Sequence, residues 1–281
     1  MMRLSSTTTQ RTYRYVRLAI LGAVLSIGVA LVIVLATEGP LTSLSGLFYT
    51  SGRTAFTGAL IAVALALVAL SGHSVEQILL DVAALFAPLI AVIPTPVALG
   101  DLPGETGCPG AVPCVPEAFV PGVTTGIITF AVMAIVGAGC ALILARVQQT
   151  LSPGVLIGVI AAGVVAVVML VWLLVWPDAL LHIGHLVVTA AFFGIMVAIA
   201  VVSAAASRRP WRRVYVIVAV GMAASLLYLA IVGIVRLTGV DLSGQPWTLV
   251  GEIGVIGFFA VFWVAQTVQK WNEVDPSLVA R

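Results

Sequence analysis

Four ionisable residues stand at the edges of long apolar runs in this sequence: Arg53, His182, His185 and Glu252. Leaving such a side chain unpaired in hydrocarbon costs about 2.5–3.5 kcal/mol on insertion scales, so these residues are the first candidates for a functional site. His182 and His185 are three residues apart and share one face of a helix. With Glu252 or Asp178 as a third ligand, they could hold a zinc ion with an open position for water, as a zinc hydrolase requires.

The same histidines have a simpler interpretation. Near a membrane interface, His hydrogen-bonds to Ser or Thr or pairs with a carboxylate, and neither arrangement needs a metal. We favour this interpretation of His182 and His185, and we therefore predict no metal and no cofactor.

The composition places these residues in a membrane protein. Hydrophobic residues make up 61% of the 281 residues and charged residues only 9%, whereas a soluble domain has about a quarter charged residues. Long apolar runs separated by short polar breaks are typical of a helical membrane protein rather than of a β-barrel. The net charge is only +2, and no basic block accompanies aromatic residues in a polar region. We therefore expect membrane lipids as partners and no nucleic acid. The sequence leaves protein partners unknown.

The apolar runs predict an all-α integral membrane protein with eight transmembrane helices. Residues 18–268 would form a single transmembrane domain, between tails at residues 1–17 and 269–281. The predicted spans are residues 18–36, 55–70, 78–99, 123–145, 155–176, 180–206, 214–235 and 247–268. The second span is the shortest. Ser74 and Gln77 form a capping-box pattern that predicts where the third helix starts.

Basic residues predict the orientation of these spans. Of the 13 Lys and Arg residues, all but Arg53 and Arg236 fall on the side of the N-terminus when the spans alternate in direction. Because cytoplasmic loops are enriched in Lys and Arg, we predict that both termini are cytoplasmic and that the protein lies in the plasma membrane.

One external loop of some length is expected at residues 100–122. It is rich in Pro and Gly and contains Cys108 and Cys114, six residues apart. On the outer side of the membrane a disulfide between them would persist and hold together a loop too short to form a core. Free or metal-binding thiols are the alternative, although the loop contains no histidine to complete a zinc site.

The predicted topology brings Arg53, His182, His185 and Glu252 to the same depth, near the outer leaflet. We expect them to form an outer polar cluster in which Glu252 pairs with Arg53, or with Arg236 as the second candidate. Such a pair would either lock two helices together or serve a substrate or a proton. At the inner side, Asp81 is expected near the start of the third helix, where the helix dipole and a basic residue such as Arg146 would stabilise its charge.

Three stretches resemble a known group of proteins. The stretch SLSGLFYTSGRTAFTGAL, with its Ser-x-Ser, aromatic, Thr, Arg and small-Gly pattern, resembles a group of uncharacterised bacterial polytopic membrane proteins that are distantly similar to the Frag/DRAM/Sfk family. The stretches HLVVTAAFFGIMVA and EIGVIGFFAVFWVAQTVQKW are similar to the same group. This resemblance implies a helical bundle with Arg53, His185 and Glu252 as its polar residues, and it implies no catalytic activity.

These observations favour a non-enzymatic plasma-membrane protein whose outer polar cluster binds a lipid headgroup or organises the bundle. A zinc-dependent membrane hydrolase using His182, His185 and Glu252 is the first alternative. A proton-coupled secondary transporter, with Glu252 or Asp81 as the proton carrier, is the second.

Overall fold

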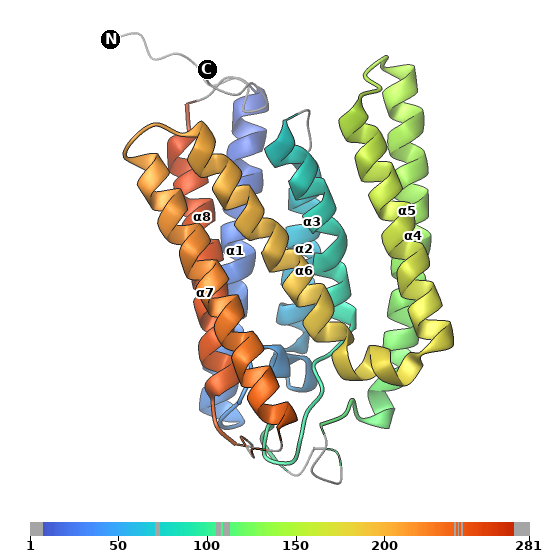
Figure 1. Ribbon diagram of the computed structural model, residues 1–281, viewed down its shortest axis with the longest axis vertical. Helices are drawn as coiled ribbons and strands as arrows, with labels where there is room; N and C mark the ends of the chain where they lie inside the picture. Colours follow the sequence, from blue (N-terminus) through green and yellow to red (C-terminus); the bar gives the residue numbers. More distant parts are fainter. Residues whose placement is uncertain are drawn as a thin grey trace.

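The computed structural model describes residues 8–70, 74–104, 108, 113–238, 240, 242 and 244–272. These residues form eight α-helices and two short 3-10 helices, and consecutive α-helices run in opposite directions (Figure 1). The α-helices are α1 (Thr8–Thr37), α2 (Arg53–Ala69), α3 (Val75–Val92), α4 (Val120–Val147), α5 (Pro153–Val175), α6 (Pro177–Ala206), α7 (Trp211–Leu237) and α8 (Trp247–Gln269). The 3-10 helices are η1 (Ser45–Tyr49) and η2 (Glu117–Phe119).

The helices have the length and composition of a membrane bundle. Seven of those described are long and apolar enough to cross a membrane, and α2, with 17 residues, is a shorter apolar helix. At a rise of 1.5 Å per residue, α2 is about 25 Å long. It packs between α1 and α3.

The two ends of the bundle differ in charge. Most described basic residues lie where α1 begins and α8 ends, here called the basic end: Arg11, Arg14, Arg17, Arg146, Arg208, Arg209, Arg212, Arg213 and Lys270. Arg53 and Arg236 lie at the opposite end, here called the loop end, with the described residues of segments 38–52, 93–119 and 238–246. The fold thus has the separation of basic residues that the sequence predicts.

Helix α1 starts earlier than predicted. Residues 8–17, expected to belong to a tail, are helical, and residues 1–7 lie outside the described part of the chain. Three side chains on one face of this extension donate to main-chain carbonyls at the end of α8. Gln10 reaches Asn272 O at 3.5 Å, Arg14 reaches Trp271 O at 2.7 Å, and Arg17 reaches Lys270 O at 3.5 Å. These contacts satisfy acceptors that a helix leaves unpaired at its C-terminus, so packing against α8 extends α1.

Helix α3 ends earlier than predicted. It was expected to continue to residue 99 but stops at Val92, and Ile93 has φ −99° and ψ 102°. Pro94 and Pro96 have no N–H to continue the helix, and a residue before proline is pushed out of the helical region. The start of α3 is as predicted: Ser74 Oγ accepts from Gln77 N at 3.2 Å and Gln77 Oε1 accepts from Ser74 N at 3.0 Å.

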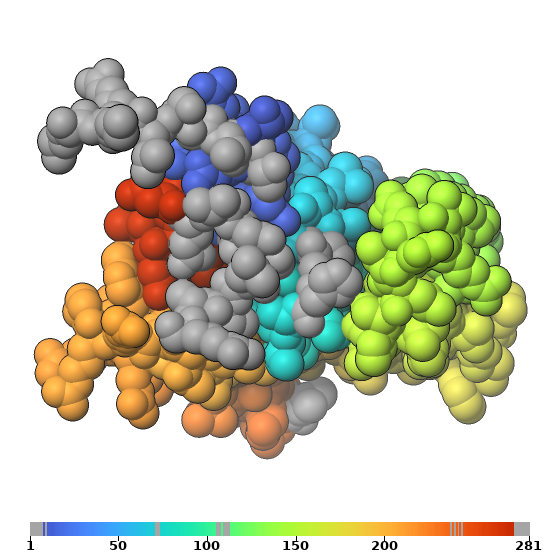
Figure 2. Space-filling view, turned by 90° about the horizontal axis from the view of Figure 1, so that it is seen from above, coloured from blue at the N-terminus to red at the C-terminus, as the bar shows by residue number. Residues whose placement is uncertain are grey.

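The helices form a main body and a side hairpin. Helices α1, α2, α3, α6, α7 and α8 make up the body, and α4 and α5 pair with each other and pack mainly on α3 (Figure 1). Seen from the basic end, the α4–α5 pair projects from one side of the molecule (Figure 2). Many of its large apolar side chains are exposed in the protein alone, as expected for helices that face lipid.

Glycines allow α7 and α8 to approach closely. A Cβ atom at Gly221 would overlap the ring of Phe258, and one at Gly251 would lie 2.6 Å from Leu229. A Cβ at Gly254 would lie 2.8 Å from Ser225 Oγ. Small residues at helix contacts are a common means of association in membranes.

The variant Gly221→Ala should therefore lower the free energy of unfolding by about 1–3 kcal/mol, because the added methyl group overpacks the contact with Phe258. Thermal unfolding in detergent micelles measures this change. Gly257→Ala on α8 is the matched control, because a Cβ there meets no atom within 4 Å and alanine favours the helix by about 1 kcal/mol. Equal stability of the two variants would contradict this packing.

Candidate functional site

A short polar segment is buried at the loop end of the body. In this η1 segment, defined as residues 41–50, every residue from Leu41 to Phe48 is buried. Irregular main chain at membrane depth is stable only when its polar groups have partners inside the protein. Gly46 N donates to Ser43 Oγ at 3.1 Å, and Leu47 N donates to Leu44 O at 3.1 Å. The segment therefore satisfies part of its own main chain and takes its remaining contacts from the helices.

Glu252, on α8, supplies the first of these contacts. Its Oε2 accepts from Leu44 N at 2.6 Å, and its Oε1 lies 2.6 Å from Ser45 Oγ. The side chain is only 9% exposed, and both carboxyl oxygens are directed at the η1 segment. Glu252 thus holds this segment against α8.

His185, on α6, supplies the second contact. Its Nδ1 donates to Ile93 O at 2.6 Å, and its Nε2 lies 2.9 Å from Ser45 Oγ. Ile93 O lies beyond the end of α3, and the N–H of Val97, four residues on, instead donates to Cys114 O. His185 therefore caps α3 and joins it to the η1 segment. We call Ser45, His185 and Glu252, with Leu44 N and Ile93 O, the polar clasp.

Arg53 lies outside the polar clasp. The expected ion pair between Arg53 and Glu252 does not form. Arg53 starts α2, is exposed, and places its guanidinium carbon 4.2 Å from the ring centre of Phe48 and 5.4 Å from that of Phe119. Both residues lie at the loop end, but Glu252 faces inward and Arg53 outward.

His182 also lies outside the polar clasp. It is exposed, whereas His185, one turn later on α6, is 6% exposed with both ring nitrogens in contact with other residues. Residues three apart differ by about 60° around a helix, which is enough here to place one inside and one outside. Within the described part of the chain, no three His, Cys, Asp or Glu side chains come close enough to hold a metal ion.

A second buried carboxylate ties the loops of this end together. Asp101 is 4% exposed, and its oxygens accept from Thr42 Oγ1 and Ala98 N, each at 2.9 Å. Arg236, the second candidate partner for Glu252, instead lies 3.6 Å from Asp101. The role of Asp101 was not predicted, although its place after Gly100, which has φ +85°, is typical of a tight turn.

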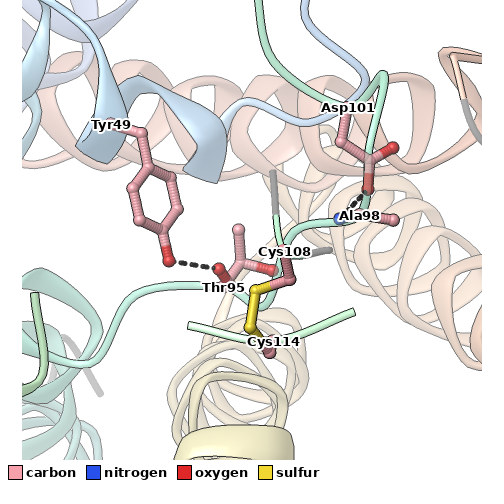
Figure 3. Close-up of a disulfide and its surroundings, with 6 residues drawn as sticks. All are labelled: Tyr49, Thr95, Ala98, Asp101, Cys108 and Cys114. Atoms are coloured by element: carbon pink, nitrogen blue, oxygen red, sulfur yellow. Dashed lines mark hydrogen bonds between the residues drawn. A yellow bond between two sulfur atoms is a disulfide. The ribbon is translucent and has the colours of Figure 1, made fainter. Parts of the chain in front are cut away.

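Beside Asp101, two contacts hold the segment between α3 and α4, and Figure 3 shows both. Cys108 and Cys114 form the predicted disulfide, with 5.8 Å between their Cα atoms. Tyr49, in η1, donates its hydroxyl to Thr95 O at 2.7 Å. Burial raises the pKa of Tyr49 above its usual range, against a smaller opposite effect of Arg53, so the hydroxyl keeps its proton for this bond.

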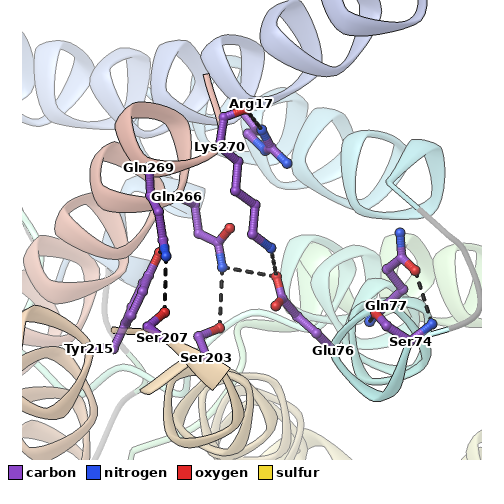
Figure 4. Close-up of polar contacts among 10 residues, drawn as sticks. All are labelled: Arg17, Ser74, Glu76, Gln77, Ser203, Ser207, Tyr215, Gln266, Gln269 and Lys270. Carbon is purple, nitrogen blue, oxygen red and sulfur yellow. Dashed lines mark hydrogen bonds and ion pairs between the residues drawn. The ribbon is translucent and has the colours of Figure 1, made fainter. Parts of the chain in front are cut away.

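A separate polar network lies at the basic end (Figure 4). Lys270 Nζ donates to Glu76 Oε1 at 2.8 Å, and Gln266 Nε2 donates to the same oxygen at 2.9 Å and to Ser203 Oγ at 3.2 Å. The network borders a small recess that Tyr13, Leu80 and Trp263 also line. Glu76 forms an ion pair with Lys270, and Asp81, the predicted inner polar residue, lies half-buried further along α3.

The polar clasp differs from a hydrolytic triad. The carboxyl of Glu252 contacts the serine hydroxyl, whereas a triad carboxylate contacts the far nitrogen of the histidine. The main-chain N–H groups that follow Ser45, those of Gly46 and Leu47, already donate to Ser43 Oγ and Leu44 O. They are thus not free to stabilise an oxyanion.

Comparison with protein-family models, curated proteins and solved structures finds no match to this chain.

Proposed function

We propose that this chain is a non-enzymatic, multi-pass protein of the plasma membrane that binds the phosphate group of a lipid at Arg53. The observation that carries this proposal is the environment of Arg53. Its guanidinium is exposed, lies against Phe48 and Phe119, and makes no ion pair with any described residue. The polar clasp has the complementary role of holding the bundle together at the same end.

The chemistry around Arg53 favours an anionic ligand. Arg53 is the first residue of α2, where the helix dipole adds partial positive charge, and no acidic residue lies in the first turn. A guanidinium offers a planar fork of N–H donors that matches phosphate, and stacking on rings limits its motion before binding. The nearby carboxylate of Glu38 already accepts from Ser51 N at 3.2 Å.

This function fits eight crossings with both termini in the cytoplasm. A helix of 17 residues is at the short limit for spanning a bilayer, which allows α2 to cross. The basic end would then lie in the cytoplasm and the loop end outside, in accord with the distribution of Lys and Arg. The disulfide at the loop end also suits an oxidising outer compartment. Arg53 would contact the outer leaflet.

The zinc hydrolase has less support from the geometry. It requires two histidines and a carboxylate around one point, whereas His182 is exposed and His185 is enclosed by Ile93 and Ser45. The resemblance to the group related to the Frag/DRAM/Sfk family remains a prediction. It implies a helical bundle without catalytic activity, in accord with a non-enzymatic role.

We expect Arg53→Ala to weaken the binding of phosphatidylglycerol about ten- to a hundredfold, because charge-assisted hydrogen bonds contribute about 1.5–3 kcal/mol. The measurement is native mass spectrometry of the purified protein titrated with phosphatidylglycerol and, separately, phosphatidylcholine. Arg236→Ala is the matched control, since Arg236 is the other described arginine of the loop end and faces Asp101. It should retain binding.

A purely structural role for Arg53 gives a different result. The contacts with Phe48 and Phe119 would then stabilise the loop end, and Arg53→Ala would lower the unfolding temperature without changing lipid binding. That result would refute the lipid site. Arg53→Lys should bind phosphate with intermediate affinity, because lysine keeps the charge but lacks the planar fork.

A further inference from the structure

The polar clasp forms a continuous chain of hydrogen-bonding atoms. It runs from Glu252 Oε1 to Ser45 Oγ at 2.6 Å, on to His185 Nε2 at 2.9 Å, and from His185 Nδ1 to Ile93 O at 2.6 Å. The three side chains come from α8, the η1 segment and α6, and all are at least nine-tenths buried.

Counting hydrogens along this chain fixes how many protons it holds. Ile93 O only accepts, so His185 Nδ1 carries a hydrogen. Ser45 has one hydroxyl hydrogen, which serves either the contact with Glu252 or the contact with His185. The other contact needs a second hydrogen, which comes either from a protonated carboxyl or from a protonated Nε2. With an ionised Glu252 and a neutral His185, one of the two contacts would have no hydrogen.

We propose that Glu252, Ser45 and His185 form a buried proton-binding site, which holds one exchangeable proton and passes it between carboxyl and imidazole through the serine hydroxyl. In the transfer, the Glu252 O–H bond breaks as that proton binds to Ser45 Oγ, and the original Ser45 O–H bond breaks as its proton binds to His185 Nε2. The carboxyl becomes a carboxylate and the imidazole becomes an imidazolium. The clasp stays neutral overall, so the transfer buries no net charge. The lipid site at Arg53 plays no part in it.

The neighbouring charged residues do not change this count of hydrogens. Asp101 and Arg236 pair with each other, and Thr42 links Asp101 to α8 through Leu249 N, which donates to Thr42 O at 2.8 Å. At the loop end, the described titratable or charged residues around the clasp are Glu38, Tyr49, Arg53, Asp101, Glu117, Asp178, His182, Tyr228 and Arg236. Not one of them makes a hydrogen bond or ion pair with Glu252 or His185 among the described residues.

Spectroscopy of the wild-type protein in phosphatidylcholine nanodiscs tests the site. Infrared spectra report a protonated carboxyl, assigned to Glu252 by its loss in Glu252→Gln, and nitrogen NMR of labelled histidine reports whether His185 is an imidazolium. At neutral pH, we expect the spectra to show either a protonated Glu252 carboxyl with a neutral His185 or an ionised Glu252 with a His185 imidazolium. An ionised Glu252 beside a neutral His185, or both groups protonated at once, would overturn the proposal.

Variants sharpen the test. In Glu252→Gln the amide donates to Ser45 and its oxygen accepts from Leu44 N, so His185 should show one protonated and one unprotonated nitrogen; an imidazolium there would contradict the site. Ser45→Ala should lose the coupling, so that Glu252 and His185 titrate separately with pH. Ser45→Thr keeps the hydroxyl and should restore the wild-type signature.

Ser203→Ala is the control. Ser203 is a buried serine of α6 at the basic end, and its replacement should leave the signature of Glu252 and His185 unchanged. If Ser45→Ala does not fold, the wild-type spectra decide alone.

Discussion

Replacing Glu252 by alanine should lower the free energy of unfolding by about 3–5 kcal/mol, because it removes one partner from a buried polar pair. Leu44 N would lose its acceptor, and the carboxyl contact of Ser45 would be lost with it. Each buried polar group left without a partner costs about 1–3 kcal/mol. Thermal unfolding in detergent micelles should show a fall of several degrees or more, since 1 kcal/mol corresponds to about 2–4 °C in a chain of 150–250 residues.

Two further variants test whether Glu252 acts through these hydrogen bonds or through an ion pair. Glu252→Gln keeps an acceptor for Leu44 N and gains a donor for Ser45. Its free energy of unfolding should therefore be much closer to that of the wild-type protein than the free energy of unfolding of Glu252→Ala is. If Glu252 instead paired with Arg53, as first expected from the sequence, glutamine would break the ion pair and be nearly as costly as alanine. Glu38→Ala, at an exposed carboxylate of the same end, should change stability by less than about 1 kcal/mol.

Replacing Asp101 by alanine should lower the free energy of unfolding by about 2–4 kcal/mol. The change removes acceptors from Thr42 Oγ1 and Ala98 N in a site that is 4% exposed, and it releases the loop after α3 from residues preceding η1. Chemical unfolding monitored by tryptophan fluorescence can measure the change. Easier proteolysis of residues 93–119 should accompany it, because the loop opens locally before the bundle unfolds.

The contribution of the ion pair can be separated from that of the hydrogen bonds. Asp101→Asn keeps an oxygen for Ala98 N and loses only the negative charge, so it should cost less than alanine. Arg236→Ala removes the partially exposed partner and should cost no more than about 1 kcal/mol. A large effect of Arg236→Ala equal to that of Asp101→Ala would show that charge, rather than hydrogen bonding, holds this loop.

Several features of the fold were predictable because they depend on short-range chemistry. The apolar runs predicted all eight helices, and the alternation of basic residues predicted which ends lie together. The capping box at Ser74 and Gln77 was predicted because its bonds join residues three apart. The disulfide between Cys108 and Cys114 was predicted from two cysteines six residues apart in a loop expected on the outer side of the membrane, where a disulfide persists.

Other features depended on packing between distant segments. The tail residues 8–17 became helical because the end of α8 gives Gln10, Arg14 and Arg17 acceptors to bind. The η1 segment is buried because Glu252 and His185 satisfy polar groups that a short loop would otherwise leave to water. Those partners lie far along the chain and belong to neither segment.

The polar residues show most clearly which features the sequence determines and which depend on tertiary packing. The order of apolar and basic residues determined the depth of Arg53, His185 and Glu252 along the bundle axis, and all three lie at the loop end. Only the tertiary structure determined the direction in which each side chain points around that axis. That direction depends on how all the helices are rotated and packed, and here it joins Glu252 to Ser45 and leaves Arg53 on the surface.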